Sequence, residues 1–124
     1  MRTAVTIAVA GAFGAVSRHY VESAVNRRIG DAFPWGTFIV NVSGSFALGL
    51  LVGLFARRFS VPLWLQAGAT VGFLGAYTTF STLTLQIYRS TATGHLLVAA
   101  LNTIGSLTAG VLALYAGLLL TRVL

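Results

Sequence analysis

The residues of this chain that could do chemistry are mostly uncharged. Inside the apolar stretch from Leu63 to Tyr88, the run Gly72–Thr84 reads GFLGAYTTFSTLT, with five hydroxyl residues within seven positions. An earlier apolar stretch carries Thr37, Asn41 and Ser45 at intervals of four residues, followed by glycines at the same spacing. Amide and hydroxyl groups donate hydrogen bonds and can replace part of the hydration shell of a small anion. The chemistry indicated is binding by neutral donors.

Catalytic and metal-binding constellations are missing from the sequence. The chain has no cysteine, one aspartate and one glutamate, and it shows no paired carboxylates and no Ser/His/Asp arrangement. His19 and His95 lie at the ends of apolar stretches, which makes them poor metal ligands. No Asp, Glu, Lys or His lies in the middle of a stretch, where proton-coupled carriers usually place an ionisable group. We therefore expect a protein that is not an enzyme.

Composition defines the class of protein. Of 124 residues, 56% are hydrophobic and 8% are charged, whereas soluble domains carry roughly 25% charged residues. The formal net charge of +6 reflects few acids and scattered arginines. These values exclude a disordered chain, an ordinary soluble enzyme and a nucleic-acid-binding domain.

Four apolar stretches organise the chain: Thr3–Tyr20, Trp35–Ala56, Leu63–Tyr88 and Leu96–Thr121. Each has close to the ~20 residues that a helix needs to cross the hydrocarbon core of a bilayer. We predict an all-α integral membrane protein with a single four-helix transmembrane domain over residues 1–124.

The arginines divide evenly between the two ends of the predicted spans, so the positive-inside rule assigns no orientation. Either the few charges give a noisy count, or copies insert both ways round and pair antiparallel. Arg2, Arg57, Arg58 and Arg122 fall on one side, and Arg18, Arg27, Arg28 and Arg89 on the other.

The third span is predicted to be broken near its middle. Glycine and threonine weaken a helix, and hydroxyl side chains can satisfy the backbone groups that a break releases. Such a break is tolerated at membrane depth only where it is buried in protein or lines a cavity. Its released carbonyls can hold a cation, and its released N–H groups favour an anion.

Small and polar residues also recur on one face of the second and fourth spans. Asn102, Ser106 and Gly110 repeat in the fourth span the four-residue spacing seen in the second. For the glycines, we interpret these faces as close packing surfaces between helices. The amides of Asn41 and Asn102 need partners, which could come from another helix or from a ligand. Four short helices enclose little, so a pore would need a second copy.

Three segments together resemble the CrcB/Fluc fluoride channel family. They are residues 11–18 (GAFGAVSR), 34–46 (PWGTFIVNVSGSF) and 72–82 (GFLGAYTTFST), and residues 105–107 (GSL) fit the family's fourth span. The resemblance covers the chain in order, and the segments are specific in combination.

The resemblance implies a fluoride-selective channel in the bacterial plasma or inner membrane. Family members are antiparallel, dual-topology dimers whose two pores let cytoplasmic fluoride leak out passively. Asn41 would donate to fluoride, and Phe80 would present its positive ring edge. A structural sodium ion at the dimer centre would be held by the backbone carbonyls of Gly75 and Thr78. The remaining pathway residues would be Thr37, Ser81, Thr82, Leu83 and Ser106, and the structural residues Arg18, Gly44 and Gly72.

Two positions depart from the family pattern. Leu83 replaces a second phenylalanine, and Gln86 replaces a glutamate. The chain could be a homodimer that needs one phenylalanine per pathway, or it could pair with a second family member. A small multidrug-type proton-coupled antiporter has the same size, but that class depends on a glutamate in its first span, and Thr6–Ala15 contains no acid. An accessory subunit of a heteromeric channel is the other alternative.

Overall fold

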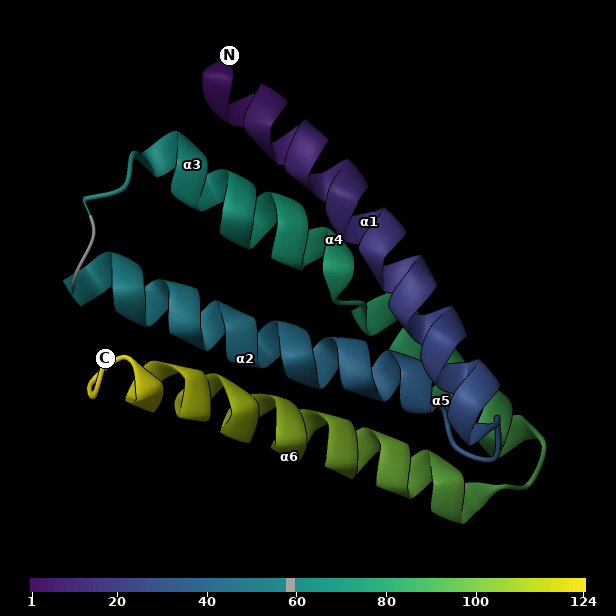
Figure 1. Ribbon diagram of the computed structural model, residues 1–124. Helices are drawn as coiled ribbons and strands as arrows, with labels where there is room; N and C mark the ends of the chain where they lie inside the picture. The colour runs from purple at the N-terminus through teal and green to yellow at the C-terminus, as the bar shows by residue number, and fades with distance from the viewer. Residues whose placement is uncertain (58–59) are drawn as a thin grey trace.

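The computed structural model describes residues 1–57 and 60–124, and every regular element within them is helical (Figure 1). Arg58, one of the arginines counted above, lies outside the described residues. In chain order the elements are α1 (Arg2–Ile29), α2 (Trp35–Arg57), α3 (Leu63–Ala67), η1 (Gly68–Leu74), α4 (Gly75–Tyr77), α5 (Phe80–Ala92) and α6 (Leu96–Leu120).

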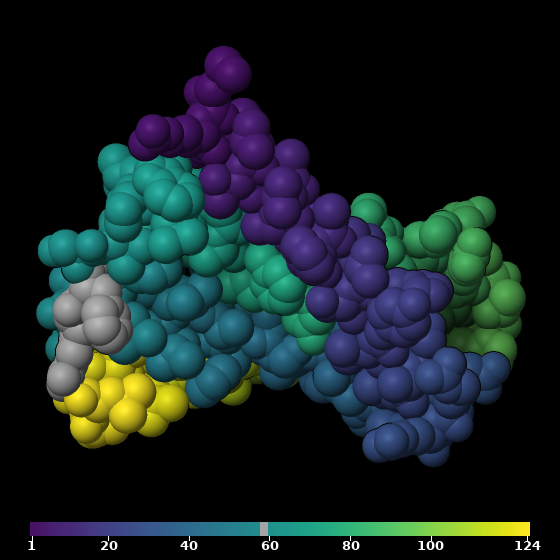
Figure 2. All heavy atoms as spheres, turned by 45° about the horizontal axis from the view of Figure 1, so that its top comes forward, coloured from purple at the N-terminus to yellow at the C-terminus, as the bar shows by residue number. Residues whose placement is uncertain are grey.

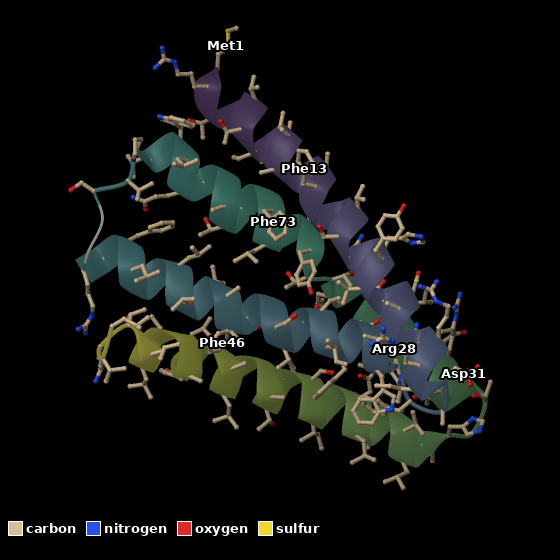
Figure 3. All side chains as sticks on the ribbon, viewed as in Figure 1. Met1, Phe13, Arg28, Asp31, Phe46 and Phe73 are labelled. Atoms are coloured by element: carbon tan, nitrogen blue, oxygen red, sulfur yellow. The ribbon has the colours of Figure 1, made fainter. Side chains whose placement is uncertain are left out.

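Helices α2 and α6 lie side by side along most of their length (Figure 1). A side chain at Gly49 would collide with the carbonyl of Leu114, and one at Gly117 would collide with the carbonyl of Phe46. Figure 3 shows the Phe46 side chain in the region between these two helices. Because glycine lets the two backbones approach closely, the small-residue face predicted on the second span is confirmed as a packing surface.

Helix α1 crosses the segment formed by α3, η1 and α4, as Figures 1 and 2 both show. The element η1 is a π-helix of seven residues, a wider form that is rare and usually short. Its Gly72 lies against α1, where an added Cβ would come within 2.8 Å of the carbonyl oxygen of Ile7. The glycines of this segment therefore set how close it lies to α1.

Helix α1 extends beyond the first apolar stretch, which ends at Tyr20, and continues to Ile29. The charged residues Arg18 and Glu22 do not end a helix, and no glycine or proline lies between them and Ile29. The helix ends where Gly30 takes a positive φ of 91°, a conformation that favours glycine.

Two extended residues divide the third predicted span. Thr78 (φ −83°, ψ 157°) and Thr79 (φ −149°, ψ 114°) separate α4 from α5. Consequently, only α1, α2 and α6 are single helices long and apolar enough to cross a membrane among the described residues. The third predicted span, Leu63–Tyr88, instead consists of shorter helices that continue to Ala92.

Apolar side chains cover the outside of the molecule, and polar ones are as deeply buried as apolar ones. Asn102 is 1% exposed and Thr37 3%, while Phe80 is 70% exposed. A surface of this kind suits a lipid environment or contact with another subunit, which agrees with the predicted membrane class.

Candidate functional site

A cavity of about 370 Å³ lies where the interruption between α4 and α5 faces α2 and α6. None of its lining residues is charged. They come from α2, η1, α4, the interruption, α5 and α6, and are Asn41, Gly44, Ser45, Leu48, Thr70, Leu74, Gly75, Thr78, Thr79, Phe80, Leu83, Ser106, Leu107, Gly110, Val111 and Leu114.

Asn41 holds the interruption with both ends of its amide. Its Oδ1 accepts a hydrogen bond from the backbone N–H of Thr79 at 2.8 Å, and its Nδ2 donates to the carbonyl of Thr79 at 3.2 Å. A primary amide carries two N–H donors, so one of them is not used by this pair. Asn41 therefore stabilises the extended backbone and keeps a donor for another acceptor at the cavity.

The carbonyls of Gly75 and Thr78 have lost their helical donors. In a continuous α-helix each would accept from the N–H four residues later. The N–H of Thr79 donates instead to Asn41, and the N–H of Thr82 donates to the side chain of Thr79 at 3.2 Å. Both carbonyls belong to residues that line the cavity, and carbonyl oxygen is a ligand that hard cations prefer.

The hydroxyl of Thr79 caps the start of α5. It accepts from the Thr82 N–H, donates to the Thr82 hydroxyl at 3.0 Å and lies 3.4 Å from the hydroxyl of Ser81. The predicted residues Ser81 and Thr82 are thus joined to the interruption through Thr79. Thr79 is not among the predicted site residues, although threonine is one of the residues preferred at a helix N-cap.

Phe80 and Leu83 occupy different environments on α5. Both line the cavity, but Phe80 is exposed on the surface of the chain, whereas Leu83 is only 4% exposed. The ring of Phe80 is therefore available to a second subunit, and Leu83 is packed within this one.

Ser106 and Asn102 form a buried pair on α6. The Ser106 hydroxyl donates to Asn102 Oδ1 at 3.0 Å, and Asn102 Nδ2 has no partner among the described residues. Ser106 lines the cavity, and the Asn102 amide is oriented by it.

Thr37 does not line this cavity and lies in the first turn of α2. Its hydroxyl accepts from Gln86 Nε2 at 2.7 Å and donates to Glu22 Oε1 at 3.3 Å. Gln86 lines a second cavity, of about 460 Å³, at the end of the molecule where Figure 3 labels Arg28 and Asp31. The structure thus separates Thr37 from the other predicted pathway residues.

The three predicted structural residues lie apart from one another. An added Cβ at Gly44 would collide with the Thr78 methyl group, so Gly44 lets α2 approach the interruption. Gly72 lies against α1, as described above. Arg18 lies in the middle of α1, half-buried and eleven residues before the helix ends.

Comparison with known proteins identifies the family. Residues 5–118 match the family model described as CrcB-like protein, Camphor Resistance (CrcB). A protein of Magnetococcus marinus named fluoride-specific ion channel FluC is 45% identical over 95% of this chain and 96% of its own length. A protein of the same name from Geotalea uraniireducens is 39% identical over the whole of both chains. Another, from Nitrobacter winogradskyi, is 41% identical over 95% of this chain and 94% of its own length. The resemblance stated from the sequence motifs is confirmed: the chain belongs to the CrcB family.

Proposed function

We propose that this chain is a multi-pass membrane subunit of a fluoride channel that lets cytoplasmic fluoride leave the cell passively. Relatives similar to it along its full length are named fluoride-specific ion channels. The observation that carries the proposal is the uncharged cavity at the interruption between α4 and α5. An ion that loses water there meets neutral donors rather than a fixed charge, so it can be bound weakly enough to leave again.

Fluoride would be bound by donors from both sides of this cavity. Asn41 has one N–H beyond the one that it gives to Thr79. The N-terminus of α5, a helix of thirteen residues, begins at Phe80 beside it, and helix N-termini favour anions. Ser81 and Thr82, which are joined to the interruption through Thr79, would add hydroxyl donors, and Phe80 a ring edge. Ser106 would donate once its hydroxyl turns from Asn102 Oδ1 to the anion.

The third span would cross the bilayer as a broken helix. The helical residues Leu63–Tyr77 and Phe80–Ala92 together reach roughly 40 Å at 1.5 Å per residue, more than the ~30 Å hydrocarbon core. With α1, α2 and α6 this gives four crossings in a single domain over residues 1–124.

The assembly would be an antiparallel dimer with two pores and a structural sodium ion at its centre. The carbonyls of Gly75 and Thr78 fit a sodium site, because neither receives its helical N–H donor. Gly75 is exposed on this chain, and an added Cβ would meet only the Thr70 carbonyl, at 3.8 Å. This open position leaves room for a second copy, or for a second family member that supplies the phenylalanine absent at Leu83.

The test is fluoride efflux from proteoliposomes that contain the purified chain, followed with a fluoride electrode. We expect fluoride to leave while chloride is retained. Asn41→Asp should reduce the efflux rate about 100-fold, because an ionised carboxylate cannot donate and repels the anion. Ser43→Ala, two residues along α2 and outside the cavity lining, is the matched control and should conduct normally.

Other results would point to the alternatives. Substrate movement driven only by a pH gradient would indicate an antiporter. Flux that requires co-reconstitution with a second family member would indicate a heteromeric channel.

A further inference from the structure

A chain of hydrogen bonds joins three helices outside the uncharged cavity. Gln86 on α5 donates through Nε2 to the hydroxyl of Thr37 on α2 at 2.7 Å, and that hydroxyl donates to Glu22 Oε1 on α1 at 3.3 Å. Thr37 is 3% exposed. Gln86 Oε1 is also buried and has no hydrogen-bond partner among the described residues.

The number of protons available to this series of hydrogen bonds determines which group donates in each of them. A threonine hydroxyl has one proton, and a carboxylate accepts only. When Thr37 donates its one hydrogen bond to Glu22, it has only lone pairs left for Gln86. The glutamine must then turn its nitrogen to Thr37 and leave its oxygen unpaired. The two ends of an amide have nearly the same shape, so its orientation depends on its partners.

We infer that Glu22 is a positioning residue that acts through the Thr37 hydroxyl to hold the Gln86 amide with its oxygen unpaired. This inference rests on the proposed function, because its consequence concerns an anion at the end cavity, which Gln86 lines. Gln86 Oε1 is covered by neighbouring atoms, so it acts on an anion in the end cavity through its negative partial charge, which disfavours the anion there. An amide turned the other way would place its positively polarised N–H groups at that position instead.

Several charged groups surround this chain of hydrogen bonds. Arg18 lies one turn before Glu22 on α1, and Arg89 lies about one turn after Gln86 on α5. Asp31, Arg89 and His95 line the end cavity with Gln86. Removing the carboxylate of Glu22 therefore changes both the local field and the hydrogen bonding, and the experiment must separate the two effects.

Nuclear magnetic resonance of the chain in nanodiscs, labelled with ¹⁵N-glutamine, reads the amide orientation directly. The sequence has only two glutamines, Gln66 and Gln86. We expect nuclear Overhauser effects between the Gln86 amide protons and the Thr37 methyl group in the unmodified protein, with or without fluoride. Gln66, whose Nε2 donates to the carbonyl of Val61 at 2.8 Å, is the internal reference.

Glu22→Met removes the acceptor with little change in size. In this variant fluoride should weaken the Gln86–Thr37 effects while those of Gln66 stay constant. Absence of these effects in the unmodified protein would overturn the inference, as would their persistence in Glu22→Met with fluoride.

Flux measurements separate hydrogen bonding from charge. At low fluoride, Glu22→Met should raise the efflux rate about fivefold over Asp31→Asn, the change that one neutral hydrogen bond supports. Asp31→Asn removes the only other carboxylate side chain in the sequence and is the charge-matched control. In a Thr37→Val background, Glu22→Met should raise the fluoride efflux rate no more than Asp31→Asn does.

Equal gains in the two backgrounds would mean that Glu22 acts through its field alone, and would overturn the inference. If the unmodified chain moves no fluoride, the proposed function fails. The role of Glu22 is then still tested by the Gln86 amide orientation that nuclear magnetic resonance measures.

Discussion

At the scale of single residues, the cavity depends on what each side chain already binds. Asn41 uses both ends of its amide on the backbone of Thr79, so its first role is structural, and only its second N–H is available to an anion. Phe80 is exposed and Leu83 is buried although both line the cavity. An aromatic ring at position 83 would therefore meet the cavity from inside the subunit.

Leu83→Phe should raise the rate of fluoride efflux about fivefold. Phenylalanine adds a positive ring edge that attracts the anion, and a fivefold change corresponds to about 1 kcal/mol. The 370 Å³ cavity has room for the larger side chain. The measurement is efflux from proteoliposomes at matched protein density. Leu83→Met changes shape without adding a ring and should not raise the rate. An equal increase in the two variants would show that the ring edge has no role.

At the scale of elements, close approach of α2 to the interrupted segment positions Asn41. Gly44 makes this possible, since a Cβ there would collide with the Thr78 methyl group and lie 3.2 Å from the ring of Tyr77. The Asn41–Thr79 pair and the Gly44–Thr78 contact lie one helical turn apart on α2. The position of the interruption thus depends on a helix distant in sequence.

Gly44→Ala should destabilise the protein by about 1–3 kcal/mol, because the added methyl group forces α2 away from Thr78. Thermal unfolding in detergent measures the loss. Gly105→Ala on α6 is the matched control: its Cβ would meet only Phe38, at 4.0 Å, and alanine favours a helix over glycine. A Gly44→Ala protein as stable as this control would contradict the proposed packing.

At the scale of the whole molecule, polar groups are buried and apolar side chains cover the outside. The exposed apolar residues include Phe80, which lines the cavity, and Val71, which follows the cavity-lining Thr70, as well as many residues on α1 and α6. One face that adjoins the cavity also contains the exposed Gly75. A second copy bound at this face would close the cavity and bring the carbonyls of two chains together.

Gly75→Val should reduce the dimer fraction by at least tenfold without unfolding the subunit. The subunit has room for a side chain there, whereas a dimer that meets at Gly75 does not. Light scattering in detergent gives the molecular mass, and helical content measured by circular dichroism reports the fold. Gly72→Val is the contrasting variant, because its side chain would meet Ile7 and Ala10 within the subunit. A Gly75→Val protein that remains dimeric would place the interface elsewhere.

The sequence by itself determined the class of protein, the bounds of α2 and α6 to within a residue, and the uncharged chemistry. These features depend on composition and on spacing along one helix, which are local. The small-residue spacing likewise predicted the face on which α2 packs against α6.

Only the tertiary structure decided which groups meet. Asn41 and Thr79 are 38 residues apart, and Thr37 and Gln86 are 49 apart, so neither pair leaves a local pattern. For the same reason, the sequence does not predict that Thr37 lies outside the cavity or that hydrogen bonds link Glu22 to Gln86. The pattern of residues along a helix predicts which of them lie on one face. The rotation and separation of packed helices decide which of those residues form hydrogen bonds with another helix.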